Sequence, residues 1–280
     1  MTPRHILIWL SLPAAVFLFL FFVLPLSVLV VESWEGGGAA YGRLVSDPVF
    51  WKGLQGSLVL GVAAPLFSVL VGLCVALYLA RLGEGARTTL LFVISLPLTF
   101  SGLIVAYGFI LVFGRAGFFT MSVAKLGADP AVVGGFIYSP LGLGFAYSYY
   151  LIPRVVMVVL PVVQNFDHAQ LAAARSLGAG NLRSYLDILI PQIFPSLLTA
   201  FCLTSAVAIG AYGTALALVG TQVNILPLVL YSKISETGSD FPAAAAISVV
   251  LMAITCAIIA VAELFGGRDA ARAATRRKAA

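Results

Sequence analysis

The chain contains six apolar stretches that are each long enough to cross a lipid bilayer as a helix. A membrane-spanning helix needs about 20 mainly apolar residues, because the hydrocarbon core is about 30 Å thick. Only 10% of the 280 residues are charged and the mean hydropathy is +1.07, whereas a soluble domain carries about 25% charged residues. The sequence therefore predicts an all-α, polytopic membrane protein with six transmembrane helices. The expected spans are Ile6–Val31, Leu54–Ala80, Leu90–Gly114, Leu141–Val163, Phe194–Val219 and Ala243–Leu264.

Lysine and arginine are distributed unevenly between the segments that connect these spans. Such residues accumulate in cytoplasmic loops, so their count indicates orientation. With both termini in the cytoplasm, ten fall inside, namely Arg4, Arg81, Arg87, Arg175, Arg183, Arg268, Arg272, Arg276, Arg277 and Lys278. Five fall outside, namely Arg43, Lys52, Arg115, Lys125 and Lys233. The bias predicts cytoplasmic N- and C-termini, and this placement explains the net charge of +5 without a nucleic-acid partner.

The spans divide the chain into three parts. Residues 1–52 hold the first span and the first outside loop. The apolar run of this span is longer than the roughly 7–15 residues of a signal-peptide core, so we expect a retained anchor. Residues 53–265 form a core of five spans, and residues 266–280 form a basic cytoplasmic tail, which we expect to lie near anionic lipid.

A polar segment, residues 165–191, separates the fourth and fifth spans and cannot lie in lipid. Its first part, Ala169–Leu177, is rich in helix-forming residues, and Gly178 can end this helix in a left-handed conformation. Asn181–Ile190 can form a second helix, and Pro191 can occupy the first turn of the next span without losing a needed hydrogen bond. The sequence therefore predicts a helical elbow in the cytoplasm, where another protein can contact it.

Small residues, a glycine and a proline follow one another in this elbow at a spacing that resembles the EAA loop of the membrane subunits of ATP-binding-cassette importers. The residues at or beside the matching positions are Ala172, Ala173, Ala174, Arg175, Gly178, Ile188 and Pro191. Ile190 replaces a leucine of the family pattern, and Ala172 stands where the family has glutamate. Gln170, Arg175 or Asp167 could compensate for the missing carboxylate.

Most of the chain resembles the MetI-like permeases, the inner-membrane components of binding-protein-dependent transport systems. Three further motifs are similar to the spermidine/putrescine-type branch, namely Leu24-Pro25-Leu26, Leu96-Pro97-Leu98 and Tyr150-Leu151-Ile152-Pro153. The resemblance implies a type I importer permease fold in a bacterial inner membrane, with the loop at 165–191 coupled to the ATPase. It also implies as partners two cytoplasmic ATP-binding-cassette subunits, a second permease that is equal or homologous, and a periplasmic solute-binding protein.

The sequence offers no arrangement of residues that is typical of bond-making chemistry. The histidines are His5 and His168, both at membrane edges, so a buried Ser–His pair has no base. The phosphate-binding pattern Gly-x-x-x-x-Gly-Lys-Ser/Thr is absent, so ATP hydrolysis must reside on a separate subunit. Cys74, Cys202 and Cys256 lie in apolar runs and indicate neither a disulfide framework nor a metal site. We expect no catalytic residue, no cofactor and no metal.

Arg154 lies near the middle of the fourth span, and no acidic residue within the spans is placed to neutralise it. A charge at the bilayer centre costs at least about 2.5–3.5 kcal/mol, and such residues commonly mark substrate pathways. Arg154 could face a water-filled pathway and meet an anionic group. It could instead reach the interface with its charge, pair with a loop carboxylate, or bind carbonyls freed by Pro153. The other pathway candidates, which could instead serve helix packing, are Tyr107, Tyr150, Tyr212 and Thr214.

The substrate class stays open at this point. The branch resemblance implies a small polar solute of the polyamine type. A buried cation at Arg154 repels a polyamine and favours an anionic or zwitterionic solute such as a phosphonate. An ATP-independent secondary transporter is a third alternative, but such proteins use intramembrane acids or broken helices for ion coupling, and the spans lack such acids.

Overall fold

The computed structural model describes residues 12–220, 223–235 and 240–279, with side chains up to residue 264. All regular elements in these ranges are helices, and six helical segments are long and apolar enough to cross a membrane. They are Leu12–Ser33, Pro48–Leu79, Gly102–Ala124, Pro140–Gln164, Asn181–Ile209 and Phe241–Leu264. The expected fold class is therefore confirmed. Residues 1–11, which include the beginning of the expected first span, lie outside the described residues.

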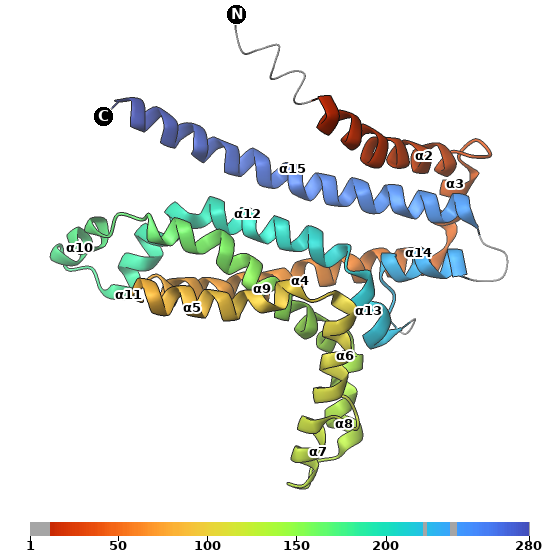
Figure 1. The fold of residues 1–280 in the computed structure, drawn as a ribbon, viewed down its shortest axis with the longest axis horizontal. Coiled ribbons are helices and arrows are strands. Elements are labelled where there is room, and N and C mark those ends of the chain that lie inside the picture. Colours follow the sequence, from red (N-terminus) through yellow and green to blue (C-terminus); the bar gives the residue numbers. More distant parts are fainter. Residues whose placement is uncertain (1–11, 221–222, 236–239, 280) are drawn as a thin grey trace, which may run out of the picture.

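Most of the membrane helices run side by side in an elongated bundle (Figure 1). α4 (Pro48–Leu79) packs along α9 (Pro140–Gln164), and α12 (Ile190–Ile209) packs against both of them and against α15 (Phe241–Ala279). α2 (Leu24–Ser33) lies along α15. The backbone of α15 continues as a helix through most of the basic tail, towards the end of the bundle that carries the elbow between α9 and α12. The side of the membrane on which this end lies stays a prediction.

The expected third span, Leu90–Gly114, is wrong as a single helix. α5 (Glu84–Ser95) passes into a short 3-10 turn, η2 (Leu96–Thr99), and α6 (Gly102–Phe113) begins only after an interruption. At Phe100 the backbone is extended, with φ −91° and ψ 144°. The apolar composition continues across this break, so the hydropathy of the sequence did not reveal it.

Pro97 and Ser101 lie on the two sides of the break between α5 and α6. Pro97 has no N–H to donate to a helical hydrogen bond, and the Ser101 side chain accepts from the Ile104 N–H at 3.5 Å, which caps α6. Together with α7 (Phe118–Ala124) and α8 (Pro130–Gly135), α6 projects from the bundle as a separate arm (Figure 1).

The expected fifth span, Phe194–Val219, is also interrupted and begins earlier than predicted. A continuous helical run extends from Asn181 to Ile209. The chain then leaves the helical conformation at Ala211, with φ −76° and ψ 89°, before α13 (Tyr212–Val219) begins. α14 (Leu226–Ser235) follows and packs against α4 and α15.

Two π-helical turns in the described part of the chain each end two residues before a proline. η1 (Phe19–Val23) precedes Pro25, and η4 (Tyr185–Leu189) precedes Pro191. In η4 the Ile190 N–H bonds to the carbonyl five residues earlier. A proline ring clashes with the carbonyl four residues before it, and a wider turn relieves this crowding. Pro191 therefore lies in the first turn of α12, as expected, but α12 continues the helical run from Asn181 without a break.

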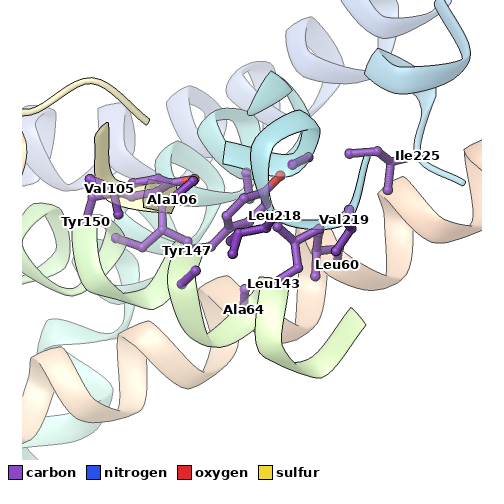
Figure 2. Close-up of a cluster of buried hydrophobic side chains, with 14 of the residues drawn as sticks. Leu60, Ala64, Val105, Ala106, Leu143, Tyr147, Tyr150, Leu218, Val219 and Ile225 are labelled. Atoms are coloured by element: carbon purple, nitrogen blue, oxygen red, sulfur yellow. The ribbon is translucent and has the colours of Figure 1, made fainter. Parts of the chain in front are cut away.

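Close helix contacts at glycine hold the bundle together. A Cβ at Gly72 of α4 would lie 2.6 Å from Val155 Cγ1 of α9, and a Cβ at Gly61 would lie 2.5 Å from Ile209 Cγ1 of α12. Small residues let helix backbones approach in this way within membranes. Figure 2 shows the neighbouring apolar cluster, in which side chains of α4, α6, α9 and α13 interlock around the buried Tyr147.

Charged residues connect the helices at the end of the bundle that lies opposite the elbow. The Lys233 Nζ lies 3.1 Å from Asp47 Oδ2, and the Arg43 guanidinium lies 3.0 Å from Asp240. Asp47 also caps α4 by accepting from the Val49 N–H at 2.8 Å. Burial alone would raise the pKa of Asp47, but this backbone hydrogen bond and the Lys233 ammonium outweigh burial and lower the pKa.

Candidate translocation pathway and coupling loop

The elbow at residues 165–191 contains α10 (Ala169–Ser176), which ends in a compact left-handed turn at Gly178. Gly178 has a φ of +89°. Its N–H bonds to the Arg175 carbonyl at 3.0 Å, and the Ala179 N–H bonds to the Ala174 carbonyl at 3.1 Å. This pair of bonds defines a Schellman motif, in which glycine is favoured because it has no Cβ. The expected helix end at Gly178 is confirmed.

Side-chain contacts fix the elbow to the membrane helices. Leu171 is only 3% exposed and joins the apolar cluster of α4, α9 and α12. The Gln192 Nε2 donates to Gln170 Oε1 at 2.6 Å, and the Arg81 Nη2 donates to the Tyr185 hydroxyl at 3.0 Å. The elbow is thus packed against the bundle, and a force on α10 would be transmitted to the spans on both sides of it.

The outer surface of the elbow carries small and apolar groups. Ala172 and Ala173 are exposed, and Leu177 and Leu182 are 89% and 74% exposed. Ile188 is half-buried. Large exposed apolar side chains in a segment that cannot lie in lipid mark a protein contact surface.

The residues that could compensate for alanine at position 172 have different surroundings. Gln170 is bonded to Gln192, and Asp167 accepts from the Ala169 N–H at 3.0 Å. Arg175 is exposed and borders a cavity of about 300 Å³ at the base of α10. Among the described residues, neither Arg175 nor Asp167 has an ion-pair partner. Of the two, only Asp167 carries the negative charge that a glutamate would supply.

A second cavity, of about 270 Å³, lies where the two interrupted spans meet α9. It brings together three of the predicted pathway residues: Arg154, Tyr150 and Thr214. The remaining lining residues come from both interruptions, namely Pro97, Leu98, Phe100, Gly102, Val207, Gly210, Ala211 and Gly213. We refer to this space as the Arg154 cavity.

Hydrogen bonds between helices hold the two interruptions beside this cavity. The Thr214 hydroxyl donates to the Gly102 carbonyl at 3.0 Å and joins α13 to the start of α6. The Tyr147 hydroxyl donates to the Ala211 carbonyl at 2.7 Å and satisfies the backbone where α12 stops. Irregular backbone within a membrane is tolerated where protein or a cavity satisfies its polar groups. Sequence reasoning missed this junction; Pro97 and Gly210 were the available signals.

Arg154 is half-buried and turns towards its own helix. Its Nη1 donates to the Tyr150 carbonyl at 3.2 Å, and its guanidinium carbon lies 5.7 Å from the centroid of the Tyr150 ring. No carboxylate lines the cavity, and the ion pairs in the described part of the chain involve other cations.

The two other predicted pathway residues lie elsewhere. Tyr107 on α6 is 56% exposed and does not border the Arg154 cavity. The Tyr212 side chain packs on Tyr231 of α14, with ring centroids 5.5 Å apart. Their assignment to the pathway stays a prediction.

Permease proteins of several transport systems, named for different substrates, align with much of this chain. The sulfate transport system permease protein CysT of Salmonella typhimurium is 27% identical over 246 residues, or 87% of this chain and 86% of that protein. The putative 2-aminoethylphosphonate transport system permease protein PhnU of the same species is 25% identical over 271 residues, or 95% and 94%. The spermidine/putrescine permease protein PotB of that species is 28% identical over 172 residues, or 61% and 59%.

The fold is shared with a solved transporter structure. A chain of the bacterial alginate ABC transporter, solved with an alginate pentasaccharide-bound periplasmic protein, superposes with a TM-score of 0.78 over 94% of both chains at 17% identity. Residues 68–268 also match the family model described as "Binding-protein-dependent transport system inner membrane component". The chain therefore belongs to the family of inner-membrane components of binding-protein-dependent transport systems.

Proposed function

We propose that this chain is the permease subunit of an ATP-driven importer that carries a small oxyanion past Arg154. The family is a membrane transport component, and the chain is a transport subunit with ATP hydrolysis on a separate protein. Its partners are two cytoplasmic ATPases, a second permease and a periplasmic binding protein that delivers the solute. Its location is the bacterial cytoplasmic membrane.

The environment of Arg154 carries the proposal for the substrate. Among the described residues, no carboxylate lines the cavity beside the guanidinium, and the one hydrogen bond of the guanidinium is to a backbone carbonyl. At an effective dielectric of 20, unit charges 4 Å apart interact by about 4 kcal/mol. This energy attracts an oxyanion and repels an ammonium group of a polyamine by a similar amount. Electrostatics therefore favours the anion.

The relatives support the same choice. CysT and PhnU, whose names specify sulfate and 2-aminoethylphosphonate, align with 87% and 95% of this chain. PotB, whose name specifies spermidine and putrescine, aligns with 61%. The substrates of both CysT and PhnU contain a tetrahedral oxyanion group, which is the chemistry that a guanidinium recognises.

We further propose that the elbow transmits the movement of the ATPase to the pathway. The exposed Leu177 and Leu182 supply apolar contact, and the small side chains at Ala172 and Ala173 allow close approach. The anchors at Leu171 and Gln170 join this surface to the spans. Because alanine replaces the glutamate of the family pattern at position 172, shape and apolar contact carry the docking.

Uptake by the complete importer tests the substrate proposal. Cells that express the permease with its partner subunits should accumulate labelled sulfate or 2-aminoethylphosphonate, and excess putrescine should not compete. Arg154→Gln should reduce anion uptake at least tenfold, because removal of one close charge pair is worth more than 1.4 kcal/mol. Lys125→Gln, which removes an exposed positive charge on the projecting arm, should leave uptake unchanged. Uptake of putrescine with no uptake of either anion would refute the proposal.

A further inference from the structure

We infer that two helix N-termini and the Tyr150 hydroxyl form, together with Arg154, a binding site for a tetrahedral oxyanion in the Arg154 cavity. This inference rests on the proposed transport of an anion. The N-termini, the hydroxyl and the guanidinium would together hold the ion, and the interruptions of the third and fifth spans would serve to place helix N-termini at the cavity.

Both interrupted spans restart at the cavity with the N-terminal end of a helix. α6 begins at Gly102 and α13 begins at Tyr212, and the cavity lining includes Gly102, Gly213 and Thr214. The first N–H groups of a helix have no intrahelical acceptor. No side chain in the described part of the chain caps α13, and the Ser101 cap of α6 accepts there from one N–H. Such an end attracts anions through its free N–H groups and its partial positive charge.

The Tyr150 hydroxyl is an independent sign of a missing partner. Tyr150 is 8% exposed and lines the cavity. Its hydroxyl oxygen is buried and forms no well-aligned hydrogen bond among the described residues. Its polar neighbour is the Thr214 hydroxyl, whose proton is given to the Gly102 carbonyl. Buried polar groups are almost always hydrogen-bonded, and an exception requires an explanation. A ligand oxygen in the cavity that accepts from this hydroxyl supplies one.

Two carbonyl groups beside the cavity are already engaged. The Gly102 carbonyl accepts from Thr214, and the Tyr150 carbonyl accepts from Arg154. The donors available at the cavity include the guanidinium, the helix N–H groups and the phenol. An oxyanion presents only acceptors and satisfies these donors, whereas an ammonium ion would add more donors to the same space.

The size of the cavity fits this chemistry. Its volume is about 270 Å³, and one water molecule occupies about 30 Å³ in the liquid. The space therefore holds a small polyatomic ion with part of its hydration. It lies just below the range of about 300–1,000 Å³ that is typical for drug-sized ligands.

Equilibrium binding to the intact importer, purified without its binding protein, tests the site. The probes are labelled sulfate, 2-aminoethylphosphonate and putrescine. Tyr150→Phe removes the hydroxyl and keeps the ring. It should weaken oxyanion binding about tenfold or more, as expected for a hydrogen bond to a charged group, and it should not lower the unfolding temperature. Tyr149→Phe is the matched control, because Tyr149 is 42% exposed and its ring packs on Phe109, outside the cavity lining.

The outcomes separate this site from the proposed function. If Arg154→Gln abolishes oxyanion binding while Tyr150→Phe binds like wild type, the site is refuted and anion transport stands. If wild type binds putrescine and neither oxyanion, both proposals fail. Weakened binding in Tyr150→Phe, with unchanged binding in Tyr149→Phe, supports the site.

Discussion

Substitution of Gly178 gives a direct measure of the turn that shapes the elbow. Gly178 has a φ of +89°, and no atom lies within 4 Å of a Cβ built on it. The effect of a side chain is therefore conformational and does not arise from a clash. A left-handed conformation costs an ordinary residue about 1–2 kcal/mol, whereas asparagine tolerates it. We expect the destabilisation of the turn to be largest for Gly178→Val, smaller for Gly178→Ala and smallest for Gly178→Asn.

Hydrogen exchange in the intact importer measures this cost. The Ala179 N–H bonds to the Ala174 carbonyl only while the turn is closed, so its protection reports the opening equilibrium. A change of about 1–2 kcal/mol corresponds to a factor of about 5–30, and Gly178→Val should accelerate exchange by this factor. The same variant should retain less ATPase during purification, while Gly178→Asn retains nearly the wild-type amount. Wild-type exchange and ATPase retention in Gly178→Val would refute both the role of the turn and the docking of the elbow.

Two further predictions concern the bundle. Gly72→Ala should lower the stability of the protein by about 1–3 kcal/mol, because its Cβ would lie 2.6 Å from Val155 Cγ1. The control Gly144→Ala, whose Cβ would have its nearest contact at 3.5 Å, should unfold near the wild-type temperature in detergent. Equal unfolding midpoints of the two variants would contradict the close packing of α4 on α9. The pKa of Asp47 is lowered in the folded state, so its contribution to stability should be present above its ordinary pKa of 3.8 and be lost as the pH falls below that value. Lys233→Met should weaken this acid dependence of the thermal unfolding temperature. An unchanged pH dependence in Lys233→Met would argue against the ion pair.

Hydropathy and local turn chemistry predicted much of this fold. The fourth span was predicted at Leu141–Val163 and lies at Pro140–Gln164, because its apolar run ends where polar residues begin. Gly178 was expected to end a helix, and it does so because the positive φ of the Schellman motif is a local requirement. Signals of this kind depend on neighbouring residues and can be recognised without the rest of the structure.

The interruptions at Phe100 and Ala211 could not be found in the same way. Apolar residues continue through both positions, and a hydropathy pattern does not distinguish a continuous helix from two shorter ones. The break at Ala211 is satisfied by the Tyr147 hydroxyl of α9, 64 residues away in the chain. The sequence located Arg154 at mid-span, but the groups that surround Arg154 depend on these long-range contacts.

The π turn at Tyr185–Leu189 changes the directions of side chains along the helix between Gly178 and Pro191. Each residue of a regular α-helix turns the chain by about 100° and advances it by about 1.5 Å. A turn with an additional residue therefore changes the direction in which all later side chains of the same helix point, relative to those before it. The end of the elbow and the fifth span belong to one continuous helix, Asn181–Ile209. The π turn offsets the side-chain directions of its first part from those of its second part. Removal of one residue from this turn would rotate the helix that precedes it by about 100° relative to α12.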